Sequence, residues 1–308
     1  MNIVHYDEVK DWQMTEMTLT CFNHPYSKEH IEDMISADSR LPDWGGELYA
    51  KEDDKVLGTL GMLYPHLKTK EGIEKVGGIR NVCTRPSAGR KGVSTKLFEE
   101  AHKRMKEKGV RYSFLMTDQY LVAYNLYKKL GYRNMMKYPA AYKKVDDVES
   151  DIEFKKERDP HYVRKTYENS VKSLYGLVVR ETDFMDMVDA RGWPKNKNLK
   201  IAYEDGKRIG YALFSKSRDS MICNEIAVED FNNLPKLVRA LESRVKGEYM
   251  VFKFVNPHYV KPLKDMGYGY YDDRWSKIMV KDFQDDLENS LEKMGYPGKF
   301  HNGIYESY

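Results

Sequence analysis

Residues 82–94 read Val-Cys-Thr-Arg-Pro-Ser-Ala-Gly-Arg-Lys-Gly-Val-Ser, and the fold of the first half of the chain follows from this stretch. The residues that lead into it predict a strand from about residue 75 to residue 84. The residues after it predict a helix with one buried face, because an apolar side chain recurs at every fourth position: Val93, Leu97, Ala101 and Met105. The stretch therefore joins a strand to a helix through a short loop with two glycines and two cations.

A loop of this kind can bind an anion. Gly89 and Gly92 let the backbone approach a phosphate closely. The free N–H groups in the first turn of the helix point at such an anion, and the helix dipole favours it. Arg90 and Lys91 add positive charge. The loop is neither a P-loop nor a dinucleotide-binding fingerprint, and the alternative is an ordinary strand–turn–helix connection with surface cations.

The other elements of the first half are read outward from this stretch. Upstream, helical segments are expected at about 8–20 and 27–36, and strands at 46–51 and 55–64 around a hairpin turn. Downstream, residues 112–116 predict a buried strand. A second helix follows and ends at Gly131, with an apolar stripe formed by Ala123, Leu126, Tyr127 and Leu130.

The second half repeats this order of elements. The expected segments are helices at about 160–175 and 180–191, strands at 199–204, 208–215 and 221–228, a helix at 233–245, a strand at 250–254, a short helix ending at Gly267, and final strands to about 281. The ending Leu130-Gly131-Tyr132 recurs as Met266-Gly267-Tyr268. We therefore predict two domains, residues 1–147 and 148–281, and a tail of residues 282–308.

The second copy lacks the distinctive features of the first. No glycine occurs between Val228 and Gly247, and aligning Gly267 with Gly131 places Leu263 opposite Tyr127. The glycine loop and the tyrosine are lost together while the order of elements persists. This pattern predicts a structural second domain and a single site in the first.

Composition limits the classes of function. The chain has 51 basic and 48 acidic side chains, and this balance does not indicate a nucleic-acid partner. The three cysteines, Cys21, Cys83 and Cys223, are far apart and fit neither a disulfide framework nor a metal site, so reduced thiols in a cytoplasmic protein are expected. The sequence shows no signal peptide and no apolar run long enough to span a membrane.

The loop resembles the pyrophosphate-binding motif of the GNAT superfamily of N-acetyltransferases, Q/R-x-x-G-x-G/A. The central Gly92 matches, Gly89 replaces Gln or Arg, and Ser94 replaces Gly or Ala, with Arg90 able to substitute for the first position. The strand before the loop resembles the V-A-T-x-P of the Eis-type branch, where backbone groups pair with the pantetheine arm. The resemblance implies these coenzyme contacts: Val82, Cys83, Thr84, Gly89, Arg90, Lys91, Gly92, Val93 and Ser94.

Residues 123–132 resemble the family's A-x-x-L-Y-x-x-x-G-F/Y helix. Tyr127 stands at the position of the general acid that protonates the departing coenzyme A thiolate, and a phenol with a pKa of about 10 can share a proton with a thiol of about 8.5. The alternative is a core role, because Tyr127 belongs to the apolar stripe. Asn125 is a further candidate coenzyme contact, although Tyr120 occupies the place where the family commonly has asparagine.

The resemblance implies an α/β (α+β) fold of two tandem GNAT-like domains, each a mixed, mostly antiparallel sheet flanked by helices. It implies transfer of an acetyl group from acetyl-coenzyme A to a small-molecule or peptide amine by direct attack, with no metal, nucleic acid or membrane. The acceptor and a homo-oligomeric state stay open. Two rivals are a Fem-type aminoacyl transferase, against which the near-neutral charge argues, and a non-catalytic acyl-coenzyme A sensor.

Three further questions stay open at the level of sequence. The strand from Val76 to Thr84 carries no carboxylate to act as general base, and the candidates elsewhere are Glu47, His66, Glu74 and Asp118. The turn at residues 43–46 is a candidate pocket wall. In the Eis-type branch the C-terminus enters the active site, and the same hypothesis applies here to the tail that ends at Tyr308.

Overall fold

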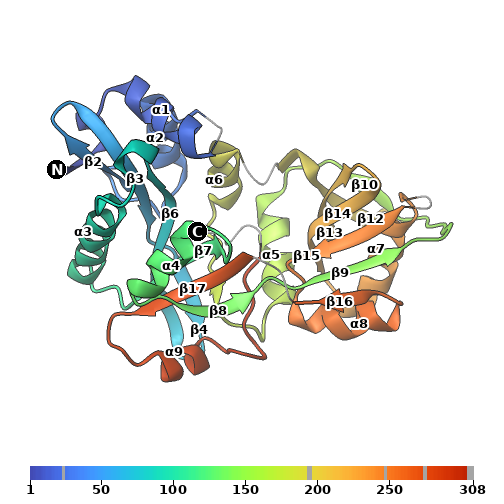
Figure 1. Cartoon of the computed structure of the whole chain (residues 1–308). Helices are drawn as coiled ribbons and strands as arrows, with labels where there is room; N and C mark the ends of the chain where they lie inside the picture. Colours follow the sequence, from blue (N-terminus) through green and yellow to red (C-terminus); the bar gives the residue numbers. More distant parts are fainter. Residues whose placement is uncertain (23–24, 193–195, 246–247, 273–275, 304–308) are drawn as a thin grey trace.

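The computed structural model describes residues 1–22, 25–192, 196–245, 248–272 and 276–303. It contains two seven-stranded sheets and a three-stranded sheet (Figure 1). Each large sheet has one parallel strand pair, the other pairs being antiparallel. The expected fold class is confirmed, since both large sheets are mixed, mostly antiparallel and covered by helices. Within the described ranges, no helix has the length and apolar character needed to cross a membrane.

The first large sheet is built mainly from the first half of the chain. In spatial order its strands are β1 (Asn2–His5), β2 (Glu47–Glu52), β3 (Lys55–Leu63), β6 (Gly77–Thr84), β7 (Tyr112–Asp118), β17 (Ser276–Asp282) and β8 (Arg133–Lys137). One face packs against α1 (Asp11–Phe22) and α2 (Lys28–Ala37). The other face packs against α3 (Val93–Glu107) and α4 (Val122–Lys129). The expected stripe on α3 is buried in that second core.

The second large sheet is built mainly from the second half. Its order is β10 (Glu153–Lys155), β12 (Leu199–Glu204), β13 (Lys207–Ser217), β14 (Ser220–Val228), β15 (Tyr249–Lys253), β9 (Ala140–Lys144) and β16 (Gly269–Tyr271). The helices α5 (Pro160–Ser170) and α6 (Phe184–Arg191) pack on one face. The helices α7 (Leu234–Glu242) and α8 (Val260–Asp265) pack on the other.

Each large sheet contains one strand from the other half of the chain. β9 directly follows β8 but pairs with β15 and β16, whereas β17 lies between β7 and β8 (Figure 1). In β17, Ile278, Met279 and Val280 are fully buried, as befits a strand covered on both faces. The division at residue 147 stays a prediction. Two strands, β9 and β17, belong to the sheet of the other half.

A small sheet and the tail also connect the halves. The small sheet has the order β11 (Leu177–Val178), β4 (His66–Thr69) and β5 (Gly72–Lys75), so that one strand from the second half pairs with a hairpin from the first. After β17 the chain forms α9 (Leu287–Lys293). Phe300 then packs into a core with β7, β8 and β17, and residue Tyr175 bridges to it.

Candidate active site

The two central strands of the first sheet separate near the predicted coenzyme loop. β6 and β7 run parallel and pair only where Gly77–Ile79 face Ser113–Leu115. Beyond this point β6 continues along β3 to Thr84, while β7 continues along β17 to Asp118. The facing edges of β6 and β7 therefore open into a wedge, as expected for a site that receives an acyl group between them.

A β-bulge lies where the wedge begins. Thr59 pairs with Cys83 and Gly61 pairs with Arg80, so a single residue of β3 faces both Asn81 and Val82. Asn81 has a φ of +51°, in the left-handed region. A bulge re-aims the side chains of its strand. Here the side chains of Arg80 and Asn81 both reach Glu47 on β2, on the face covered by α1 and α2.

A cleft of about 700 Å³ lies on the other face, between the end of β6, the loop and α4. It is lined by these predicted coenzyme contacts: Val82, Thr84, Gly89, Arg90, Gly92, Val93, Ser94 and Asn125. The remaining lining residues were not predicted: Ala88, Thr95, Val122, Ala123, Leu126 and Lys129. The signal that marks the residues on α4 is their spacing, because positions 122, 125, 126 and 129 share one helix face.

The start of α3 fits a diphosphate. Gly92 is the N-cap of this helix, has a φ of +76°, and has open space where a side chain would begin. The first N–H groups of a helix have no partner inside it, and Val93 and Ser94 of this first turn line the cleft. The Ser94 hydroxyl lies 2.6 Å from the Thr84 hydroxyl, which joins the helix start to the end of β6. Ser94 stands where the family motif has Gly or Ala, and its additional hydroxyl is bonded to the strand.

Three of the predicted site residues do not line the cleft. Lys91 lies in the loop, and its side chain is exposed. Tyr127 is buried, with its ring centroid 5.5 Å from that of Phe98 and 6.3 Å from that of Tyr132. No hydrogen bond joins its hydroxyl to the residues that the structure describes. Burial raises the pKa of Tyr127 to about 12, so the phenol keeps its proton at neutral pH.

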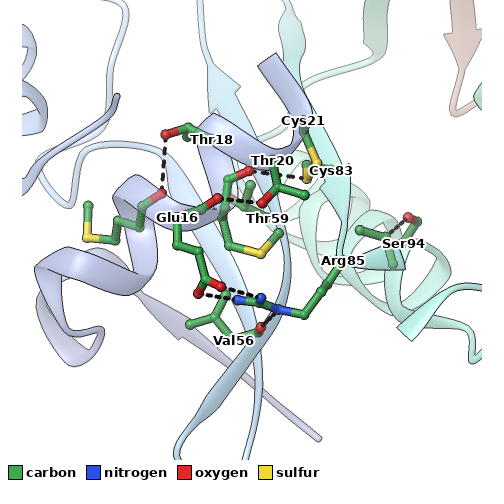
Figure 2. The surroundings of a disulfide bond; sticks show 12 residues. Glu16, Thr18, Thr20, Cys21, Val56, Thr59, Cys83, Arg85 and Ser94 are labelled. Carbon is green, nitrogen blue, oxygen red and sulfur yellow. Dashed lines mark hydrogen bonds and ion pairs between the residues drawn. A yellow bond between two sulfur atoms is a disulfide. The ribbon is translucent and has the colours of Figure 1, made fainter. Parts of the chain in front are cut away.

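Cys83 points to the opposite face of β6, where it forms a disulfide with Cys21 of α1 (Figure 2). The expectation of reduced thiols is therefore wrong for this pair. The two residues are 62 positions apart, and the fold brings their Cα atoms to 6.1 Å. Cys223 is a free, buried thiol. At the same junction, Nη1 and Nη2 of Arg85 each donate to the carboxylate of Glu16 at 2.8 Å. The disulfide and this ion pair together hold α1 to the end of β6 (Figure 2).

The candidate bases lie in different surroundings. Glu47 is fully buried at the start of β2. Asp118, at the end of β7, accepts the N–H of Tyr120 at 2.9 Å and shapes a turn. Glu74 lies on β5, which precedes the closed end of β6, and His66 lies 3.5 Å from Glu181. Glu47 is thus the candidate whose contacts reach the bulge.

The residues of the 43–46 turn lie elsewhere. Asp43 and Trp44 line a second cleft of about 610 Å³, with Tyr64, His66 and Lys75 on its other walls. Lys75 and His66 belong to the small sheet that precedes the closed end of β6. This cleft is therefore separate from the wedge.

The corresponding part of the second sheet is closed. β14 and β15 run parallel and pair as far as Cys223 and Phe252, after which β14 continues to Val228. The space beyond holds about 20 Å³, with Glu225, Leu263, His301 and Gly303 among its walls. That volume suits a single water at most. After β14 the chain passes through a 3-10 turn (Phe231–Asn233) into α7, without a glycine.

The end of the tail is described in part. Asn302 accepts a hydrogen bond from the Tyr138 hydroxyl at 3.1 Å, and Phe300 is buried. Residues 304–308, including Tyr308, lie outside the described residues. The hypothesis that the C-terminus enters the active site therefore stays a prediction.

Comparison with known proteins places this geometry in a family. Residues 6–135 match the model of the acetyltransferase (GNAT) domain. A probable N-acyltransferase from Enterococcus faecalis V583 is similar in structure, with a TM-score of 0.69 and 16% identity over 95% of this chain and 74% of that one. A GCN5-related N-acetyltransferase from Anabaena variabilis has a TM-score of 0.65 and 13% identity, over 91% and 72%.

Eis1 from Mycobacterium abscessus also shares the fold, with a TM-score of 0.59 and 13% identity over 94% of this chain and 76% of its own. At such identities the solved structures establish the fold. No curated protein matches the chain in sequence. The match at residues 6–135 covers the wedge, the loop and α4. These residues form an acetyltransferase domain of the GNAT family.

Proposed function

We propose that the first domain transfers an acetyl group from acetyl-coenzyme A to a primary amine of a small molecule or peptide. The observation that carries this proposal is the cleft of about 700 Å³, which leads from the glycine loop to the end of β6. The family model covers the same residues. The corresponding place in the second sheet, beyond the last β14–β15 pair, holds only about 20 Å³, which supports a single site per chain.

The chain's own groups have distinct tasks in this reaction. The loop and the first turn of α3 hold the diphosphate through backbone N–H groups, with Arg90 and Lys129 beside them. Val122 is 92% exposed and lines the cleft, so a bound pantetheine arm would cover it. Backbone N–H groups at the open edge of β6 polarise the thioester carbonyl, in the manner of an oxyanion hole.

Tyr127 is the proposed acid for the leaving thiolate. Its ring is fixed by the aromatic core, and its phenol stays protonated because burial raises its pKa to about 12. A thiolate formed in the wedge is poorly solvated, which raises its affinity for a proton. Proton transfer from the phenol therefore completes the release of coenzyme A.

A second candidate function is an acyl-coenzyme A sensor without turnover. It is favoured by the departures from the family motif at Gly89 and Ser94. A sensor needs the cleft but not the hydroxyl of Tyr127.

Replacing Tyr127 with Phe separates the two functions. We expect Tyr127→Phe to lower kcat by about 100-fold, the range of general acid catalysis, with unchanged affinity for acetyl-coenzyme A. Thiol release with a panel of amines measures kcat, and calorimetry measures affinity. Tyr124→Phe is the matched control on the same helix, because it removes a hydroxyl that contacts Asn134. Turnover that survives in Tyr127→Phe at the level of the control would contradict the role of Tyr127, and a wild type that binds without turnover would favour the sensor.

A further inference from the structure

A row of three residues crosses the first sheet on the face opposite the coenzyme cleft. Glu47 on β2 pairs with Gly61 on β3, and Gly61 pairs with Arg80 on β6. A Cβ at Gly61 would lie 2.6 Å from Oε1 of Glu47. The glycine therefore leaves the space through which the Glu47 carboxylate extends over β3 toward the bulge and the wedge.

One oxygen of this carboxylate is fully engaged. Oε1 of Glu47 lies 3.0 Å from Nη2 of Arg80 and accepts a hydrogen bond from Nδ2 of Asn81 at 3.3 Å. The Tyr26 hydroxyl lies 3.5 Å from the same oxygen. These contacts fix the carboxylate beside the bulge, which begins directly after the last β6–β7 pair at Ile79.

The other oxygen is free. Oε2 of Glu47 is buried and has no hydrogen-bond partner among the residues that the structure describes. A buried carboxylate oxygen without a partner is costly unless a water or a ligand group satisfies it. Glu47 itself is fully buried. The fold thus maintains an unused proton acceptor next to the point where the strands separate.

We propose that Glu47 takes the proton that the acceptor's ammonium group loses before it attacks, directly or through one water. This assignment rests on the acetyl transfer proposed above. The α1 and α2 face of the wedge is then the acceptor side, opposite the coenzyme cleft. The other candidate carboxylates are less suited, because Asp118 is engaged in a turn and Glu74 precedes the closed end of β6.

The proton balance is complete with this assignment. The ammonium gives one proton to Oε2 of Glu47, which later passes it to solvent. The neutral nitrogen then forms the N–C bond, and the C–S bond breaks. The nitrogen releases a second proton to solvent, the thiolate takes one from the phenol of Tyr127, and the resulting phenolate regains a proton from solvent. The products are an amide, a thiol and one proton in solution.

The surroundings of Glu47 set its basicity. Burial raises the pKa of the Glu47 carboxyl above its usual range, although Arg80 acts in the opposite direction. The charged and titratable groups packed around this pair come from several elements: Arg80 on β6, Tyr49 on β2, Tyr26 and Asp38 at the two ends of α2, and Arg191 at the end of α6. A raised pKa makes the carboxylate a better acceptor of the amine's proton.

The test compares Glu47→Gln with the wild type as a function of pH, using an alkylamine that the wild type acetylates. Glu74→Gln is the matched control. We expect Glu47→Gln to lower kcat by about 100-fold near pH 7. The deficit should shrink as the pH approaches the pKa of the amine, because a neutral amine needs no base. Affinity for acetyl-coenzyme A should be unchanged, and Glu74→Gln should behave as the wild type.

The outcomes separate the two proposals. A wild type that binds acetyl-coenzyme A and releases no thiol with any amine would contradict the acetyl transfer, and the role of Glu47 with it. An active wild type whose deficit on Glu47→Gln is absent or equal at every pH would contradict the role of Glu47 alone, since an equal deficit indicates a structural effect. If Glu47→Gln does not fold, Glu47→Asp serves as the test, because it keeps a carboxylate but sets it back from the wedge by one methylene group. Its deficit should be largest near pH 7 and should shrink toward the pKa of the amine. A Glu47→Asp deficit that is equal at every pH, with stability lowered in parallel, would also overturn the assignment.

Discussion

Three buried polar side chains, those of His102, Tyr132 and Ser113, connect α3 to β7 close to Tyr127. Nε2 of His102 lies 2.9 Å from the hydroxyl of Tyr132, which lies 2.5 Å from the hydroxyl of Ser113. Burial, reinforced by Lys281 and Lys106, lowers the pKa of His102 to about 3. The imidazole is therefore neutral in the folded protein at every pH where the enzyme is expected to work. This neutral ring helps to fix Tyr132 at the end of the helix that carries Tyr127.

His102 should make stability depend on pH. In the unfolded chain its pKa is about 6.5, so below that pH the unfolded state binds a proton that the folded state excludes. The free energy of unfolding then falls by about 1.4 kcal/mol per pH unit, down to the folded pKa of about 3. Between about pH 6.5 and about pH 5, the wild type should lose about 2 kcal/mol more than His102→Gln. Urea unfolding at the two pH values measures this difference, and equal losses in both proteins would contradict the buried neutral state.

Some residues of the candidate site could be predicted from the sequence, and others could not. The glycine loop was predictable because its chemistry resides in consecutive backbone groups, and most of its residues line the cleft. The disulfide of Cys83 was missed, because its partner Cys21 lies 62 residues away and only the fold brings the two together. The contact between Glu47 and Arg80 could not be predicted from the sequence either, because only the register of β2, β3 and β6 brings these residues together.

Among the elements, α1 is tied to β6 in two ways. The disulfide from Cys21 to Cys83 and the ion pair from Glu16 to Arg85 both lie just before the coenzyme loop (Figure 2). A helix held in this way fixes the acceptor face of the wedge. The sequence predicted α1 and β6 from local periodicity but contained no spacing signal for their connection.

Reduction of the disulfide should destabilise the protein. The bond spans 62 residues, and the chain-entropy model gives about 4 kcal/mol for a loop of that length. We expect reductant to lower the free energy of unfolding of the wild type by up to about this amount. Cys21→Ser should be unaffected by reductant and should resemble the reduced wild type. Equal stability of the wild type with and without reductant would contradict the bond.

At the scale of the whole molecule, the exchange of β9 and β17 makes the halves interdependent. Local patterns predicted the strands themselves, because alternating and buried apolar residues mark them wherever they pair. Local patterns did not predict which sheet each strand joins, because the two halves have the same order of elements and a similar Gly-Tyr ending. The pairing of β9 with β15 and of β17 with β7 joins residues far apart in the sequence, which local patterns do not report.

A fragment of residues 1–147 should not fold by itself. It lacks β17, which pairs with β7 along its full length and also with β8, so two strand edges and the core around Ile278 and Val280 would be open to water. We expect the fragment to show no cooperative thermal transition, whereas the full chain unfolds in one. A fragment that melts cooperatively at the temperature of the full chain would contradict this interdependence.

The central claim is a single acetyl-coenzyme A site at the loop of the first domain. Calorimetric titration with acetyl-coenzyme A tests it most directly, comparing the wild type with Gly92→Val and Gly206→Val. Both glycines have a φ near +75° and open space where a side chain would begin, so the two variants carry similar backbone strain, but Gly206 lies in a hairpin of the second half. We predict one site per chain, lost or weakened at least about tenfold in Gly92→Val and unchanged in Gly206→Val. No binding to the wild type at millimolar ligand, or equal binding to all three proteins, would contradict the claim.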